Sequence, residues 1–179
     1  MQLIGSAILT ISLTVLLGCA SNPPPRISAE RPKIDSWTIK VTTSGGLSGV
    51  GEGGWIADSQ GDVAAGRELE SYEPHYSYRL SCKGKLSEMD LLRLDRLVTS
   101  TMPSGWSERY INPQHPYGYA DDVGVLLELK YRTSGGGENS CTASWNDAAI
   151  NQVPKELLSL YDETRLRRLE VLKGCENVE

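Results

Sequence analysis

Few side chains in this sequence have the type and spacing that chemistry requires. The chain of 179 residues has four cysteines and two histidines. His75 and His115 lie far apart, and no set of four Cys or His residues has the short spacing of a structural zinc site. The adjacent acids Asp121 and Asp122 could bind a cation, but acids just before a strand are more often solvated turn residues. The sequence contains no nucleophile elbow, phosphate-binding loop or His-Glu-x-x-His motif. We therefore expect a protein that is not an enzyme, with no catalytic residue, metal site or cofactor.

The first cysteine, Cys19, ends an apolar segment without charged side chains. The run from Leu3 to Leu17 has 15 residues, whereas a membrane-spanning helix needs about 20, so its length is that of a signal-peptide core. Leu16-Leu17-Gly18-Cys19 resembles the lipobox of bacterial lipoproteins, in which the cysteine thiol is acylated and the chain is cut just before it. The resemblance implies a signal peptide at residues 1–18 and lipidation of Cys19. The alternative is an uncleaved N-terminal anchor helix.

The residues after Cys19 indicate where such a lipoprotein would lie. Ala20 and Ser21 follow the cysteine, and no Asp stands next to it. By resemblance to Gram-negative sorting rules, this implies lipid anchoring in the outer membrane, with the protein facing the periplasm. Residues 19–34 contain Pro23-Pro24-Pro25 and Pro32, which favour an extended tether over a sheet. Proline triplets can also serve as ligands for aromatic grooves.

The net charge of the chain argues against one class of partner. The formal charge is −5 and the isoelectric point is near 5.2, whereas phosphate binding needs a concentrated basic surface. The longest basic run is Arg167-Arg168, in a predicted helix with acidic residues nearby, and we expect it to be a solvated helix face. We therefore expect no nucleic-acid partner.

Residues 35–179 are predicted to form a single domain of alternating strands and helices. Apolar and polar residues alternate over 37–43, 76–82, 123–131 and 140–145, which is typical of half-buried strands. Ser87 caps a predicted helix with the apolar stripe Leu91, Leu94 and Val98. Pro154 begins a second helix that ends at Gly174, and its predicted buried stripe is Leu157, Tyr161, Leu166 and Leu169.

This order of elements predicts an α+β fold. We expect an antiparallel sheet of about four main strands with two helices on one face, in the order β-β-α-β-β-α. A glycine-rich insertion, roughly residues 50–75, and a long aromatic loop, residues 106–122, are added to it. Within the insertion, a short strand at Trp55–Ala57 and another near Val63 would suit a small hairpin.

Three cysteines remain besides Cys19, and in an oxidising compartment they allow three different single disulfides. Cys82 and Cys141 both fall on the apolar faces of predicted strands, which favours a Cys82–Cys141 disulfide. Cys175 would then be free or paired between molecules.

Two loops are candidate binding segments. Ser44-Gly45-Gly46-Leu47-Ser48-Gly49 is flexible and places one apolar side chain, Leu47, between glycines. Leu47 could contact a partner or fold back onto the core. The second loop, with Trp106, Tyr110, Tyr117 and Tyr119, is either functional or an addition to the core.

Part of the chain also resembles a known family. The segment Ile39–Gly49 with its Ser-Gly-Gly loop, the helix around Leu91–Val98, and Val125 through Trp145 to Leu158 resemble the emfourins. Emfourins are small bacterial inhibitors of thermolysin-like (M4) metallopeptidases. The resemblance implies that residues 44–49 enter the active-site cleft of such an enzyme. This chain departs from the family in its lipid anchor, its cysteines and its longer segments after the loop.

The sequence thus predicts a membrane-anchored, non-catalytic binding module. Its partner would be a metallopeptidase that it inhibits. The alternative is a structural or assembly lipoprotein that binds an envelope partner through its aromatic loop.

Overall fold

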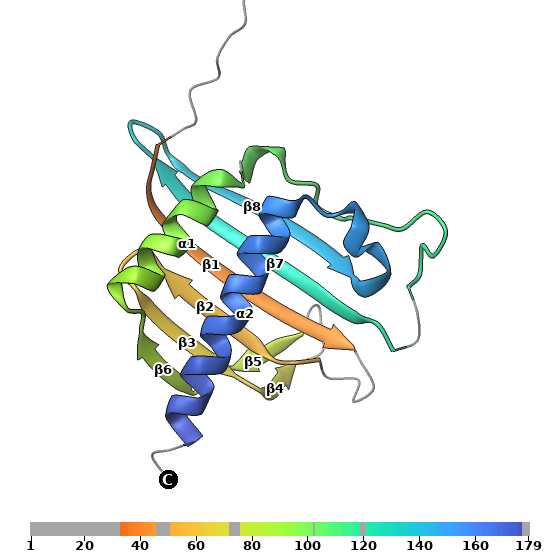
Figure 1. Ribbon diagram of the computed structural model, residues 1–179, viewed down its shortest axis with the longest axis horizontal. Coiled ribbons are helices and arrows are strands. Elements are labelled where there is room, and N and C mark those ends of the chain that lie inside the picture. The colour runs from red at the N-terminus through yellow and green to blue at the C-terminus, as the bar shows by residue number, and fades with distance from the viewer. Residues whose placement is uncertain (1–32, 46–50, 72–75, 102, 119–120, 177–179) are drawn as a thin grey trace, which may run out of the picture. The chain divides into compact units, whose positions relative to one another are not determined.

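The computed structural model describes residues 33–45, 51–71, 76–101, 103–118 and 121–176 (Figure 1). These residues belong to one compact unit, which extends from Arg31 to Glu179. The mixed α+β class and the antiparallel sheet are confirmed. The predicted signal peptide, Cys19 and most of the predicted tether lie outside the described residues.

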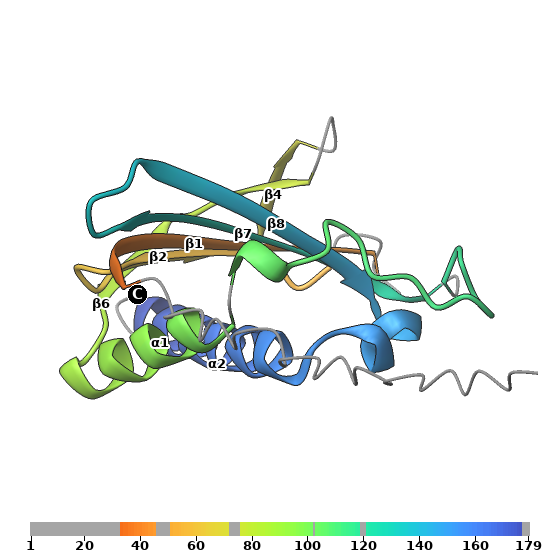
Figure 2. The ribbon, with the colours of Figure 1, turned by 90° about the horizontal axis from the view of Figure 1, so that it is seen from above.

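The main sheet has six strands, in the spatial order β6-β3-β2-β1-β7-β8. The long central strand β1 pairs with β7 from Ile34 opposite Thr133 to Gly45 opposite Val123. A second sheet of two short strands, β4 and β5, contacts β2 and β3 through β5 and lies on the face of the main sheet away from the helices (Figure 2). The strand bounds are Ile34–Gly45 (β1), Gly54–Asp58 (β2), Asp62–Gly66 (β3), Glu68–Ser71 (β4), Ser77–Arg79 (β5), Cys82–Lys85 (β6), Val123–Thr133 (β7) and Glu138–Asn146 (β8).

The main sheet therefore has more strands than the four expected. The segment predicted as a glycine-rich insertion supplies β2, β3 and β4, so much of it belongs to the sheets. The predicted strand 76–82 is instead divided between β5 in the second sheet and β6 in the main one. Gly66 explains the division in part, because a Cβ there would lie 1.7 Å from the carbonyl oxygen of Arg79. Only glycine lets β3 and β5 approach this closely.

Two helices, α1 (Glu88–Ser100) and α2 (Lys155–Glu176), lie on the same face of the sheet (Figure 2). The Ser87 cap is confirmed, since its hydroxyl accepts from the N–H of Asp90 at 3.2 Å. Leu94 and Val98 are fully buried. Short 3-10 helices span Pro103–Gly105 (η1) and Asp147–Gln152 (η2). No helix in the described part of the chain is long and apolar enough to cross a membrane.

The buried face of α2 differs from the predicted stripe. Leu157 is buried as expected, but Leu166 is 50% exposed. The helix also continues past Gly174 to Glu176. Its other buried residues are apolar and polar in about equal number, namely Leu160, Glu163, Thr164, Arg168 and Leu172. Because several buried residues of α2 are polar, the spacing of its leucines alone could not predict which face of the helix is buried.

The predicted Cys82–Cys141 disulfide is wrong. Cys82 is bonded to Cys175, with a Cα–Cα distance of 5.9 Å, and Cys141 is a free thiol. The physical reason is the strand order, because Cys82 in β6 and Cys141 in β8 lie at opposite edges of the sheet. Five strand spacings separate these edges, about 24 Å in all. The disulfide instead joins the end of α2 to the β6 edge.

Candidate functional site

The predicted binding loop leaves the sheet at the end of β1. Ser44 and Gly45 are the last residues of β1, whereas Gly46, Leu47, Ser48 and Gly49 lie outside the described residues. The chain is described again from Gly51, whose N–H donates to the carbonyl oxygen of Gly45 at 2.7 Å. Both glycines have positive φ, 79° and 70°. Added Cβ atoms would meet backbone at 2.5 Å at Gly45 and at 2.7 Å at Gly51, so the two ends of the loop require glycine.

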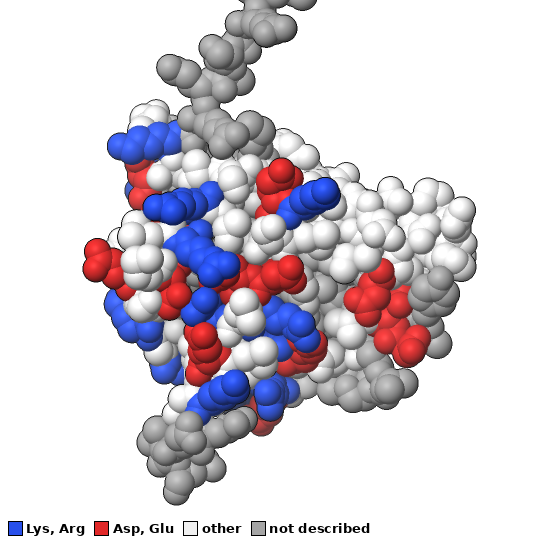
Figure 3. Space-filling model, viewed as in Figure 1, with Lys and Arg blue, Asp and Glu red and all other residues white. Residues whose placement is uncertain are grey.

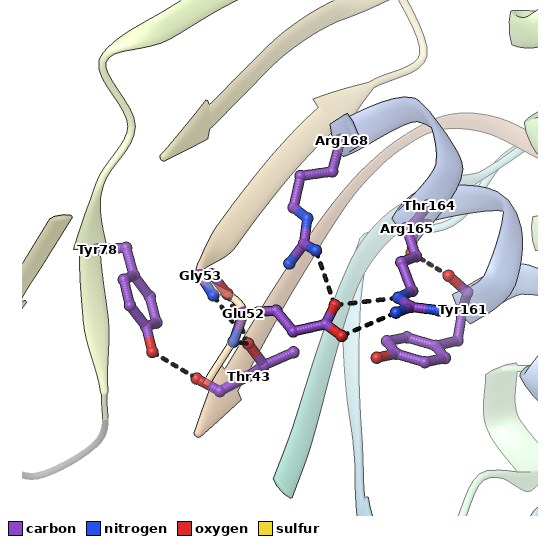
Figure 4. Close-up of polar contacts among 8 residues, drawn as sticks. All are labelled: Thr43, Glu52, Gly53, Tyr78, Tyr161, Thr164, Arg165 and Arg168. Carbon is purple, nitrogen blue, oxygen red and sulfur yellow. Dashed lines mark hydrogen bonds and ion pairs between the residues drawn. The ribbon is translucent and has the colours of Figure 1, made fainter. Parts of the chain in front are cut away.

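The buried Thr43 holds the returning chain. Its hydroxyl oxygen accepts from the N–H groups of Glu52, at 2.7 Å, and Gly53, at 3.0 Å. The same hydroxyl lies 3.0 Å from the carbonyl oxygen of Gly53, as donor. From the opposite side, the Tyr78 hydroxyl donates to the carbonyl oxygen of Thr43 at 2.7 Å (Figure 4). These bonds fix β1, β5 and the two residues before β2 to one another at the loop base.

Glu52 connects this loop base to α2. Its carboxylate accepts two hydrogen bonds from Arg165, at 2.8 and 3.0 Å, and one from Arg168 at 2.7 Å (Figure 4). The side chain of Arg168 is 7% exposed, and that of Arg165 is 49% exposed. A bidentate contact between an arginine and a carboxylate, such as that of Arg165 with Glu52, fixes the orientation of the two groups as well as their distance.

These contacts keep Glu52 ionised. Burial alone would raise the pKa of its carboxyl group, but the hydrogen bonds from Arg165 and Arg168 outweigh burial and lower the pKa below its ordinary value of 4.5. The hydrogen bond to Glu52 in turn raises the pKa of Arg165. Tyr161, which meets Trp145 edge-to-face at 5.5 Å, has its pKa raised by burial and then by the Glu52 carboxylate.

The polar groups of this arrangement are used in holding the two ends of the loop in place. Both carboxylate oxygens of Glu52 are engaged by guanidinium groups. The Thr43 hydroxyl is used by main-chain groups. The cluster therefore fixes the ends of the loop, and a contact with a partner would come from the loop itself. We call Thr43, Glu52, Tyr78, Arg165 and Arg168 the loop clamp.

The aromatic segment, residues 106–118 in its described part, is attached to the edge of β8. Tyr110 donates its N–H to the carbonyl oxygen of Ser144 at 2.8 Å, and Ser144 donates its own to Glu108 at 3.0 Å. Trp106 and Tyr110 pack against the core, whereas Tyr117 is 96% exposed. Tyr119 lies outside the described residues. The expectation that this loop adds to the core therefore holds for Trp106 and Tyr110. Its expected binding role stays a prediction.

A groove lies between the end of β1 and the aromatic segment. It has a volume of about 330 Å³, and its lining includes Ser44 from the end of β1, Gly124 from β7, and Arg109, Tyr110, Ile111 and Pro116 from the aromatic segment. Ser44 and the lining residues of the aromatic segment are 65 or more positions apart in the sequence, and they meet at this groove beside the start of the loop.

Sequence reasoning missed all five residues of the loop clamp. The expectation of a solvated Arg167-Arg168 face is wrong for Arg168, which is 6% exposed. The sequence did contain one sign that Glu52 has a charged partner, because Glu52 is the single charged residue between Lys40 and Asp58. A lone carboxylate in a glycine-rich, apolar stretch needs a partner if it is to be buried.

Comparison with known proteins yields no match for this sequence, either among protein-family models or among curated proteins.

Proposed function

We propose that the protein is a non-catalytic binding module whose contact element is the loop Ser44–Gly49. The observation that supports this most is the loop clamp, which holds both ends of the loop by buried or half-buried hydrogen bonds. A loop with fixed ends loses less conformational entropy on binding than a loop with free ends. The arrangement thus suits a presented recognition loop.

The sharpest form of the proposal is inhibition of a thermolysin-like metallopeptidase. It rests on the emfourin resemblance of residues 39–49 together with the loop clamp. Thermolysin-like enzymes favour bulky apolar side chains in their main pocket, and Leu47 supplies such a side chain from the middle of the loop. In this proposal, acylated Cys19 anchors the protein in the outer membrane, and the domain lies on the periplasmic side.

The test uses a chain from Arg31 to Glu179, which retains every described element and the whole core. It is titrated against a thermolysin-like peptidase while cleavage of a small peptide substrate is followed. We expect stoichiometric loss of activity with the module itself uncut. Leu47→Asp should weaken inhibition by about 100-fold, because it removes the apolar anchor and places a charge in an apolar pocket.

The matched control is Leu166→Asp, the same change at a leucine that is 50% exposed on α2. It should inhibit like the parent chain. Equal inhibition by Leu47→Asp and the parent would exclude the loop as the contact element. No inhibition of several thermolysin-like enzymes would reject this enzyme class as the partner.

A second candidate function is supported by the aromatic segment. Tyr117 is 96% exposed and Ile111 is 42% exposed. Charged side chains gather over α1 and α2, whereas the other end of the molecule, near η2 and this segment, shows one acidic cluster beside a broad surface without charged side chains (Figure 3). Exposed aromatic and apolar side chains with few charges are typical of the centre of a protein interface. An envelope assembly partner held by this segment is therefore the alternative to inhibition.

A further inference from the structure

The outer edge of β8 carries main-chain groups that no described residue engages. β8 pairs with β7 without a register shift from Gly124 opposite Asn146 to Arg132 opposite Glu138. On its outer side, Ser144 exchanges hydrogen bonds with Glu108 and Tyr110. Because main-chain groups of an antiparallel strand alternate between its two sides, those of Thr142 and Ser140 point outward like those of Ser144. The hydrogen bonds of the described residues leave these groups of Thr142 and Ser140 unused.

The opposite edge of the same sheet is protected in ways that β8 is not. β6 has only four residues, and two of them are lysines. One of these, Lys85, forms an ion pair with Asp62 at 2.8 Å. Short length and edge lysines both discourage pairing with another strand. β8 has nine residues, contains no Lys, Arg or Pro, and has its one charged residue, Glu138, at its first position.

The side chains along this open edge define what could pair with it. Ser140 is exposed and Thr142 is half-buried. Between them, Cys141 is half-buried and belongs to the side chains that pack against the core. A residue paired opposite Cys141 would place its side chain on the same face of the sheet, beside this thiol. An apolar side chain fits that position, and uncharged side chains fit the remainder.

A second copy of this chain would not fill the edge well. A two-fold antiparallel pairing centred on Ser140 would place Ser144 of one copy opposite Gly136 of the other. Since Ser144 already pairs with Glu108 and Tyr110, that segment would meet the β7–β8 turn of the other copy. A short extended segment of another protein has no such conflict.

We propose that the edge of β8 from Glu138 to Thr142 is a docking site for an extended, uncharged peptide segment of a partner protein. The segment adds a seventh strand to the sheet and continues the edge pairing that residues 108–110 begin at Ser144. Its main chain bonds to Ser140 and Thr142, and an apolar side chain covers Cys141. This site lies at the end of the sheet opposite Ser44 and does not depend on the proposed loop function.

The test uses the chain from Arg31 and an acetylated, amidated peptide in which Thr and Val alternate over five residues, with a lysine at each end for solubility. Binding is followed by the amide resonances of the protein and by amide hydrogen exchange. We expect a dissociation constant of about 1 mM or below. The N–H groups of Ser140 and Thr142 should become protected, while those of Lys83 and Lys85 on the β6 edge stay unchanged.

The proposed hydrogen bonds can be removed selectively by one change in the protein and by one change in the peptide. Ser140→Pro deletes an outward N–H that the β7 ladder does not use, and it should weaken binding roughly tenfold. Ser140→Ala keeps that N–H and should bind like the parent. A peptide methylated at alternate nitrogens, prepared in both registers, tests the same bonds without altering the protein, and one register should not bind.

Three results would overturn the proposal. They are equal affinity of the parent and Ser140→Pro, peptide-induced protection outside β8, and absence of binding at about 1 mM peptide. Protection of Ser140 that rises with protein concentration alone would show that a second copy occupies the edge.

Discussion

At the level of single residues, Glu52 joins the chain that returns from the loop to α2, 113 residues further along the sequence. Its carboxylate accepts from both Arg165 and the buried Arg168. Among the described residues, Arg168 forms an ion pair with no carboxylate other than Glu52. The Nε atom of Arg168 is buried without a hydrogen-bond partner. Loss of the Glu52 charge would thus leave a buried cation without compensation, which costs more than loss of an exposed ion pair.

Glu52→Gln should therefore destabilise the protein at neutral pH by about 2–3 kcal/mol. The measurement is the free energy of unfolding in urea. Glu68→Gln is the matched control, since Glu68 forms its ion pair with Arg79 at an exposed site, where its side chain is 61% exposed. The control should differ from the parent by about 0.5 kcal/mol or less. A control that loses as much as Glu52→Gln would contradict the special role of Glu52.

The difference between Glu52→Gln and the parent should depend on pH. The folded-state pKa of Glu52 lies below 4.5, so its contribution is fully present above pH 4.5 and is lost as the pH falls through the folded-state value. Glutamine does not titrate in this range. The two unfolding free energies should therefore converge below pH 4.5, and a constant gap would show that the loss is steric.

At the level of secondary-structure elements, the Cys82–Cys175 disulfide fastens the end of α2 to the β6 edge. The bond closes a sequence separation of 93 residues. On the chain-entropy model such a cross-link stabilises the folded state by about 4–5 kcal/mol.

Cys175→Ser should lower the free energy of unfolding by up to about 4–5 kcal/mol, and reductant should bring the parent to the same value. Cys141→Ser is the control and should remain sensitive to reductant. Burial raises the pKa of the Cys141 thiol to about 12, so a thiol reagent should react slowly with the folded chain at neutral pH. Peptide mapping that finds Cys82 joined to Cys141 would contradict the structure.

The elements that the sequence predicted correctly have a clear period, although the alternating segment 76–82 is divided between β5 and β6. The strand predictions at 37–43, 123–131 and 140–145 fall within β1, β7 and β8. The main-sheet strands β2 and β3 are short and rich in Ala and Gly, so their propensity signal is weak and pairing with β1 decides their structure. Pairing across the sheet also decides which cysteines meet, and a pattern along one strand carries no such information.

The candidate site was predictable to a smaller extent. Glycines at 45, 46 and 49 marked a loop, because a positive φ favours glycine. The support of that loop by Arg165 and Arg168 depends on how α2 crosses the sheet, and the residues of α2 give no sign of it. Charged residues on a buried helix face are uncommon, which is why a solvated face was expected for Arg167-Arg168.

At the level of the whole molecule, the two helices are joined by charges as well as by apolar contacts. Arg167 on α2 lies 2.8 Å from Glu163, 2.6 Å from Glu170 and 3.0 Å from Asp90 on α1. Arg93 on α1 contacts the buried Glu163 at 2.9 Å. This network and the loop clamp are both built on α2. The same helix thus connects the α1 face, the disulfide and the base of the candidate binding loop.

The attachment of this domain to a membrane is proposed to depend on one residue, Cys19. Three acyl chains on Cys19 would hold the protein firmly, since each buried methylene contributes about 0.8 kcal/mol. Cys19→Ala in the full chain should therefore abolish acylation and reduce the membrane-bound fraction. The measurements are incorporation of labelled palmitate and fractionation of cells.

A second substitution separates lipid anchoring from sorting. Ala20→Asp places an acid next to the lipidated cysteine, and by the Gram-negative sorting rule it should retain the acylated protein at the inner membrane. Labelled palmitate should still be incorporated in this variant. Membrane attachment of Cys19→Ala at the parent level would instead indicate an uncleaved anchor helix at residues 3–17. Such a helix keeps its apolar surface when the thiol is removed, so the chain length of the mature protein, measured by mass, would independently decide between the two kinds of anchor.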